Sequence, residues 1–167
     1  MEASLVGSEM CIRDSMKTPR EFIQEWMETV CSNNVKSILS LYKEDGILLG
    51  TLDSEIRKGH REIKIYFDYF LKFKPCGKII KIFEDDLGYR RTAIVNGIYV
   101  FDLVEDGVQN QAPARFTFVL DRVGTKWKIH SHHSSKKPEN IELDSISERT
   151  KTTLNSSLIL DLSLIHI

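Results

Sequence analysis

The chain has 167 residues, of which 41% are hydrophobic and 28% charged, and its formal net charge is −1 at neutral pH. A chain of this size and composition can bury a proper core as one soluble domain. The near-neutral charge disfavours nucleic acid or an anionic membrane as the main partner, and no apolar run reaches the ~20 residues of a membrane span. We therefore expect a cytoplasmic protein.

The first predicted helix begins at Pro19. Thr18 can cap its free N–H groups, and Glu21 stands where the partner of a capping box belongs. A second, short helix is predicted from Val35 to Tyr42 and a third after Gly59, with a short strand between them from Ile47 to Leu52. The apolar side chains of the first helix recur at helical spacing and are Phe22, Ile23, Trp26, Met27 and Val30.

From residue 78 onward the apolar period changes from 3.6 to 2, which predicts strands. Gly and Asp residues mark the turns between them. After Pro138 the composition is rich in Ser, Thr, Glu and Lys, so we expect residues 139–161 to be a loose segment. The predicted strands are Lys78–Phe83, Tyr89–Val104, Val108–Leu120 and Lys126–Ser134.

This order of elements predicts an α+β fold, with about three N-terminal helices packed on one face of a curved, mostly antiparallel sheet. It fits the cone-shaped nuclear transport factor 2-like fold, in which the sheet wraps around the first helix and leaves a pocket. The two cysteines within this region, Cys31 and Cys76, are too few for a disulfide framework.

The two ends of the chain do not follow the pattern of the residues between them. Residues 5–15 (LVGSEMCIRDS) and 162–167 (LSLIHI) can be encoded by one DNA element read in opposite orientations, as transposon ends are in sequencing libraries. We therefore expect residues 1–15 and 162–167 to be adapter-derived tails and residues 16–138 to be the domain. Residues 1–15 contain three acidic residues and one basic residue, so without them the net charge of −1 becomes +1.

Three sequence blocks resemble the association domain of calcium/calmodulin-dependent protein kinase II: LYKEDGILLG (41–50), NGIYVFDL (96–103) and ARFTFVLDRVGTKWKIHSHHSS (114–135). The similarity extends from about Thr18 to Pro138 and is greater to stand-alone bacterial members, near the SnoaL-like group. The resemblance implies a domain that assembles into a homodimer or a larger ring and offers a polar pocket. It does not imply kinase activity or calmodulin binding, because the phosphoryl-transfer motifs and a basic calmodulin-target helix are both missing from the sequence.

The strands themselves also indicate assembly. Residues 89–101 and 115–120 place apolar side chains on both faces, whereas a sheet that is covered on one side should alternate apolar with polar residues. A second subunit is the simplest cover for the other face, although a slightly apolar exposed sheet is the alternative. The predicted interface residues are Ile94, Ile98, Phe116 and Phe118.

Three histidines lie close together near the end of the last predicted strand. Alternation from Trp127 and Ile129 directs His133 into the cone and His130 and His132 to the outer side. A His-x-His pair can bind zinc only with a third ligand and a second shell, which no Cys cluster or His-Glu motif supplies. We therefore expect neither a metal nor another cofactor.

Arg115 is the other polar candidate, because its apolar neighbours in sequence suggest that it is buried. A buried guanidinium needs an anionic partner, which could be a ligand carboxylate or a protein carboxylate such as Glu25 or Asp102. Aromatic side chains would form the walls. The predicted pocket consists of Arg115, His133, Tyr66, Tyr99 and Trp26.

Two functions remain open at this point. The first is a non-enzymatic, self-associating domain whose pocket binds a small polar or anionic molecule. The second is a small SnoaL-like enzyme (an isomerase, cyclase or hydratase) with His133 or a carboxylate as general base. The sequence shows no clear second partner for His133, so it favours the first function.

Overall fold

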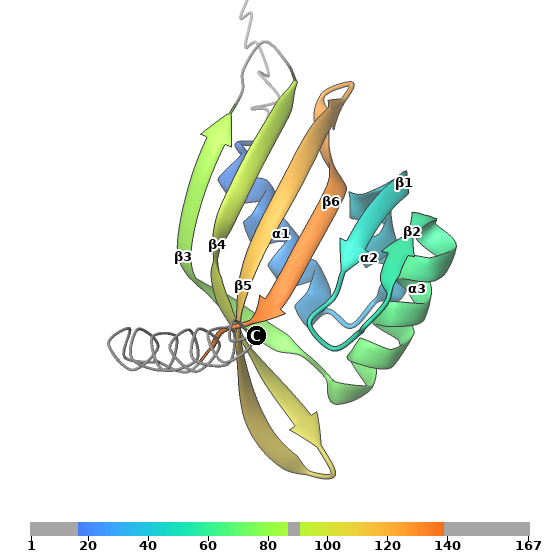
Figure 1. Cartoon of the computed structure of the whole chain (residues 1–167), viewed down its shortest axis with the longest axis vertical. Coiled ribbons are helices and arrows are strands. Elements are labelled where there is room, and N and C mark those ends of the chain that lie inside the picture. Colours follow the sequence, from blue (N-terminus) through green and yellow to red (C-terminus); the bar gives the residue numbers. More distant parts are fainter. Residues whose placement is uncertain (1–16, 87–90, 139–167) are drawn as a thin grey trace, which may run out of the picture. The chain divides into compact units, whose positions relative to one another are not determined.

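Three helices packed on one face of a six-stranded sheet make up the computed structural model, which describes residues 17–86 and 91–138 (Figure 1). The predicted tails and the segment 139–161 lie outside the described residues. In the part of the chain that is described, no helix is long and apolar enough to cross a membrane. The helices are α1 (Pro19–Cys31), α2 (Val35–Leu41) and α3 (Gly59–Phe70), and the short 3-10 helix η1 (Leu71–Phe73) follows α3.

The sheet has the strand order β2-β1-β6-β5-β4-β3. Every neighbouring pair is antiparallel except β1 and β6, which are parallel. Helix α1 packs against β3 and β4, and α3 packs against β1 and β2 (Figure 1). This arrangement confirms the predicted fold class. The strands are β1 (Tyr42–Leu49), β2 (Ile56–Lys58), β3 (Cys76–Asp86), β4 (Thr92–Glu105), β5 (Val108–Val123) and β6 (Lys126–Lys136).

The start of α1 has the predicted capping box. The backbone N–H of Glu21 donates to Thr18 Oγ1, and the Glu21 carboxylate accepts from the backbone N–H of Thr18. All five predicted apolar side chains of this helix are buried against the sheet. Each buried side chain of this size stabilises the fold by about 1.5–3 kcal/mol relative to an exposed one.

The first strands differ from the prediction. β1 begins at Tyr42 instead of Ile47, because the Asp45-Gly46 turn signal forms an irregularity within the strand and does not precede it. β2 was not predicted, since three residues are too short to show a period in the sequence.

A disulfide between Cys31 and Cys76 joins the end of α1 to the start of β3. The two cysteines are 45 residues apart in sequence. Their number did not suggest a disulfide framework, but the packing of α1 across β3 brings this one pair together. A closed loop of this length restricts the unfolded chain and thereby stabilises the folded state.

We predict that reduction of this bridge lowers the free energy of unfolding by about 2–4 kcal/mol. Urea unfolding with and without dithiothreitol measures the difference. A variant carrying both Cys31→Ser and Cys76→Ser is the control, because its stability should not depend on the reductant. Alkylation of the unfolded, unreduced protein should label one of the three cysteines. Labelling of all three would contradict the bridge.

Candidate functional site

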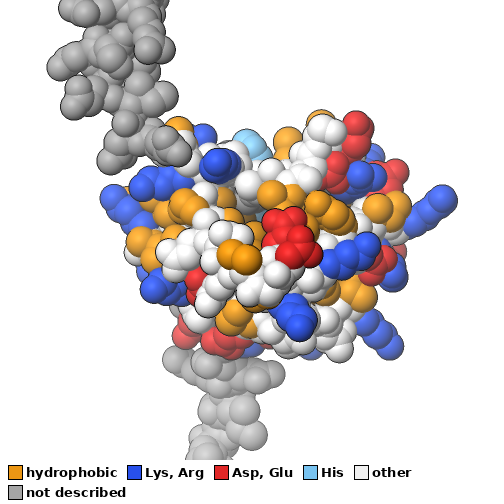
Figure 2. All heavy atoms as spheres, turned by 90° about the horizontal axis from the view of Figure 1, so that it is seen from below, with side chains coloured by type: hydrophobic (Ala, Val, Ile, Leu, Met, Phe, Trp, Pro, Cys, Tyr) orange, Lys and Arg blue, Asp and Glu red, His pale blue; other side chains and the backbone are white. Residues whose placement is uncertain are grey.

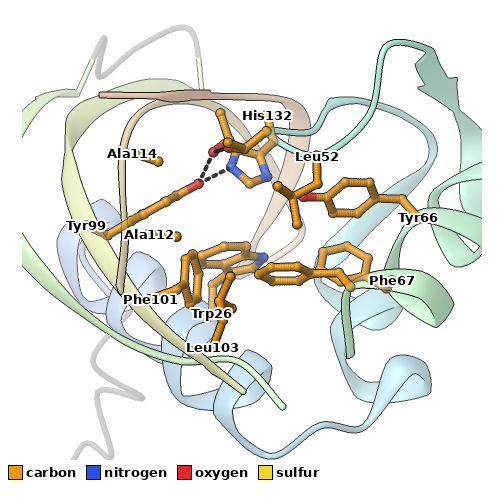
Figure 3. Close-up of a pocket in the computed structure, with 13 residues that line it drawn as sticks. Trp26, Leu52, Tyr66, Phe67, Tyr99, Phe101, Leu103, Ala112, Ala114 and His132 are labelled. Carbon is orange, nitrogen blue, oxygen red and sulfur yellow. Dashed lines mark hydrogen bonds between the residues drawn. The ribbon is translucent and has the colours of Figure 1, made fainter. Parts of the chain in front are cut away.

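A cavity lies between the helices and the inner face of the sheet, which is the face that the helices cover (Figure 3). Its volume is about 30 Å³, room for roughly two water-sized groups. The walls are mainly aromatic, and polar groups lie at the end formed by β6 and the turn after β1. The residues used below are Trp26 from α1, Tyr66 from α3, Tyr99 from β4, His132 and Ser134 from β6, and Thr51 from the turn.

An extra residue in β6 decides which histidine enters this cavity. Ile129 pairs with Leu120, but the next position of β5, Val119, pairs with Ser131, so His130 has no partner in the ladder. Such a bulge reverses the alternation of all later side chains. His132 therefore faces inward, opposite Phe118.

The prediction that His133 enters the cone is wrong for this reason, and His133 is exposed on the outer face. The predicted position of Arg115 is also wrong. Ala114 and Phe116 face inward, so Arg115 between them faces outward, where its guanidinium donates to Ser135 Oγ at 3.4 Å. Apolar neighbours in sequence do not bury a strand residue, because they lie on the opposite face.

Neither carboxylate considered for Arg115 contacts it. Glu25 forms an ion pair with Lys17 at 2.9 Å, and Asp102 accepts a hydrogen bond from Gln111 Nε2 at 2.9 Å. Both contacts lie at the surface, where a single ion pair such as Lys17–Glu25 contributes little to stability.

Two of the predicted interface residues are core residues of the protomer. Phe116 and Phe118 are 3% and 0% exposed and face the helices. Ile94 and Ile98, by contrast, are half-buried on the outer face. The sequence showed which residues of β5 share a face, but it did not show which of the two faces the helices cover.

His132 is enclosed by aromatic rings. Its imidazole stacks on Phe118 with ring centroids 3.9 Å apart, and the Trp26 ring lies nearly perpendicular to it with the centroids 5.0 Å apart. Burial, with a smaller contribution from the charge of His133, lowers the pKa of His132 to about 3. The imidazole is therefore neutral at physiological pH.

Both imidazole nitrogens of His132 contact tyrosine hydroxyls. Tyr42 Oη lies 2.9 Å from Nδ1, and Tyr99 Oη lies 3.4 Å from Nε2. Burial raises the pKa of both tyrosines, so their hydroxyls keep their protons. Tyr99 also donates to Ser134 Oγ at 2.5 Å, and Ser134 is hydrogen-bonded to Thr51 (Figure 3). These side chains form a continuous hydrogen-bonded chain of neutral groups.

The structure places the three predicted aromatic residues, Trp26, Tyr66 and Tyr99, in the cavity wall. Tyr66 packs directly on the turn after β1: a Cβ atom at Gly50 would lie 2.1 Å from the Tyr66 ring. Gly50 is thus needed for the close approach of this turn to α3. His132, Ser134 and Thr51 were not predicted for the site. The only hint of the bulge in the sequence is that three of the four residues 130–133 are histidines, so that polar side chains do not follow a strict alternation there.

The third histidine, His130, belongs to a polar cluster on the outer face of the sheet. Its Nδ1 lies 3.1 Å from Asp121 Oδ2, and Lys43 Nζ lies 3.0 Å from the same oxygen. Burial alone would raise the pKa of Asp121, but hydrogen bonds from Lys43 and Thr92 lower it. In the described ranges, no three His, Cys, Asp or Glu side chains come together in a way that could hold a metal ion.

Helices packed on one face of a curved, mostly antiparallel sheet make up the nuclear transport factor 2-like fold, and a solved structure from Novosphingobium aromaticivorans that shares this fold is described as such a protein (15% identical, TM-score 0.60 over 72% of this chain and 80% of its own). Residues 19–138 match the family model described as the calcium/calmodulin dependent protein kinase II association domain. The chain belongs to this family, which confirms the resemblance seen in the sequence.

Two solved structures are similar to this chain. An association-domain protein of this family from Xanthomonas campestris is 34% identical, with a TM-score of 0.69 over 72% of this chain and 86% of its own. The kinase II hub of S. rosetta is 18% identical, with a TM-score of 0.62 over 72% of this chain and 98% of its own. Among curated proteins, none matches by sequence.

A more distant similarity concerns the fold alone. A protein described as a scytalone dehydratase, from Novosphingobium aromaticivorans, is 11% identical, with a TM-score of 0.65 over 77% of this chain and 90% of its own. Shared fold does not imply shared chemistry.

We predict that the stability of the protein falls as the pH is lowered from about 6.5 towards 3, in part because of His132. Its pKa is about 3 in the folded state against 6.5 for the unfolded side chain, so between these values the unfolded chain binds one more proton. This single group contributes a slope of up to about 1.4 kcal/mol per pH unit. Urea unfolding at several pH values should show a shallower slope for His132→Gln.

The exposed His133 provides the matched control for this measurement. His133→Gln should change the pH dependence only slightly, because solvent and salt screen its charge. Equal slopes for wild type and His132→Gln would show that His132 is not buried in its neutral form.

Proposed function

We propose that this chain is a self-associating domain in which the outer face of the sheet packs against a second copy, while the interior cavity binds a small polar molecule. The observation that carries the first part is the composition of the outer face. No helix among the described residues covers this face (Figure 1). Even so, β3, β4 and β5 direct a group of apolar side chains to it. These are Phe83, Ile94, Ile98, Val100 and Val119.

The apolar group is continuous across three strands. Ile94 pairs with Val119 in the ladder between β4 and β5, and Phe83 on β3 pairs with Asn96, two residues further along β4. Phe83 is 58% exposed, and together with the half-buried Ile94 and Ile98 it forms an apolar patch of the kind that a partner covers. An outer face of this kind fits a two-fold interface, in which the same surface of both copies meets.

Membership of an association-domain family supports self-association as the function. The polar residues on the same face, including Asn96, Thr117 and His133, can supply hydrogen bonds at such an interface.

The geometry gives less support to an enzyme. The nitrogens of His132 contact two tyrosine hydroxyls, and no carboxylate contacts it among the residues that the structure describes. The histidine that does contact a carboxylate, His130, lies outside the cavity and is 43% exposed. An orienting role for His132 needs only its hydrogen bonds, whereas proton abstraction needs a much higher pKa than about 3.

The Cys31–Cys76 disulfide bears on the location of the protein. Structural disulfides persist in oxidising compartments and are rare in the cytoplasm. The bridge therefore favours an oxidising environment over the cytoplasmic location that the composition indicates.

We predict that Ile94→Asp dissociates the oligomer. The cross-strand neighbours of Ile94 are Val119 and Asp85, so the new carboxylate would have no cation opposite it. An unpaired carboxylate costs at least the about 1–3 kcal/mol of an unsatisfied polar group, and a two-fold interface contains the substitution twice, so association should weaken about 30-fold or more. Size-exclusion chromatography with light scattering at micromolar concentration should show an oligomeric wild type and a monomeric variant. Phe116→Asp does not serve this test, because Phe116 is a core residue and its substitution would unfold the protomer.

Ile65→Asp is the matched control. Ile65 is 51% exposed on α3, away from the sheet, so its substitution should leave the oligomer intact. Far-UV circular dichroism verifies that both variants are folded. A monomeric wild type, or equal behaviour of the two variants, would reject the outer face as the interface.

A further inference from the structure

The hydrogen-bonded chain in the cavity has a defined direction. Tyr99 donates its proton to Ser134, so towards His132 the Tyr99 oxygen can only accept. His132 must then carry its proton on Nε2, and its bare Nδ1 accepts the proton of Tyr42. All donors from Tyr42 to Ser134 therefore point the same way, towards the polar end of the cavity.

At that end one donor is left over. Ser134 and Thr51 share a hydrogen bond that uses the proton of one hydroxyl. The other hydroxyl proton has no acceptor among the hydrogen bonds of the described residues. Since both side chains line the cavity, the unused O–H is available to a molecule inside it.

A second donor belongs to Trp26, which lines the same cavity and is 1% exposed. Its indole Nε1–H is buried and forms no hydrogen bond of regular geometry with a described residue, although its interaction with the Tyr42 hydroxyl lowers the pKa of that tyrosine. An acceptor brought by a bound molecule would give this donor a better-aligned partner.

The cavity has no charge to pair with an ionic ligand. None of the side chains that line it is Asp, Glu, Lys or Arg, and burial keeps the one histidine neutral. A carboxylate that entered would lose its hydration without gaining a cation. The remaining wall is apolar and includes Phe101 and Leu103, and the exposed Leu52 borders it (Figure 3).

We propose that the cavity binds small, neutral molecules that have an apolar body and a hydrogen-bond acceptor such as a carbonyl oxygen, and that it excludes carboxylates. This inference rests on the pocket that the proposed function includes, and it replaces the anionic ligand expected from Arg115. The acceptor lies at the polar end beside Thr51 and Ser134. The small volume, about 30 Å³, limits the buried part to a few atoms, so a longer apolar end extends towards Leu52.

Three probes of the same shape test this chemistry: butanone, its hydrocarbon analogue 2-methyl-1-butene, and propionate. The full chain, labelled with ¹⁵N, is titrated with each probe, and the indole N–H signals are followed by NMR. The chain has two tryptophans. Trp127 serves as the internal reference, because its Nε1–H already donates to the carbonyl oxygen of Lys17 at 2.8 Å.

We expect butanone to shift the Trp26 indole signal with saturation, since Trp26 lines the cavity, and to leave that of Trp127 in place. The hydrocarbon should bind roughly twofold to tenfold more weakly, the worth of one neutral hydrogen bond. Propionate should produce no saturating change at the same concentrations. Tighter binding of propionate than of butanone, or equal binding of butanone and the hydrocarbon, would overturn the inference.

Thr51→Val removes one hydroxyl with little change of shape, and combined with Ser134→Ala, which removes the other, it should weaken the preference for butanone over the hydrocarbon. Thr125→Val makes the same change at an exposed turn and should have no effect. If no probe affects the cavity signals, the inference is wrong. That result would leave self-association untouched, since the oligomer is measured separately by light scattering.

Discussion

The site depends on one extra residue in β6. The bulge at His130 reverses the side-chain alternation, so His132 and Ser134 face the helices where a regular strand would direct Ser131 and His133 inward. The consequence is chemical as well as geometric. A buried imidazole and a buried hydroxyl come to face the tyrosines of β1 and β4, and the exposed histidines remain at the surface.

Burial of His132 constrains its surroundings in turn. An imidazole among aromatic rings is tolerated only if it is neutral and both of its nitrogens have partners. Tyr42 supplies one partner and Tyr99 the other. Stacking on Phe118 then fixes the plane of the ring. His132 can be buried only in its neutral form, and the same lack of charge would make the cavity unfavourable for an ion.

The two faces of the sheet have separate roles. The inner face combines aromatic packing with a neutral hydrogen-bonded chain. The outer face combines half-buried apolar residues such as Ile98 with the charged cluster around Asp121. Self-association would use the outer face and leave the cavity on the other side, so a domain of this kind can assemble without closing its pocket.

The amino-acid sequence by itself determined the fold class, the family, the capped first helix and the aromatic walls of the cavity. These features depend on local spacing: capping at Thr18, helical recurrence around Trp26, and the period-2 pattern of the long strands. The tertiary structure alone decided the contents of the site. Arg115 lies on the outer face and Phe116 in the core, the reverse of the prediction, and His132 instead of His133 lines the cavity. A strand pattern does not reveal which face is covered or where a bulge shifts the register. The Cys31–Cys76 bridge and the pairing of Thr51 with Ser134 likewise arise only when residues distant in sequence pack together.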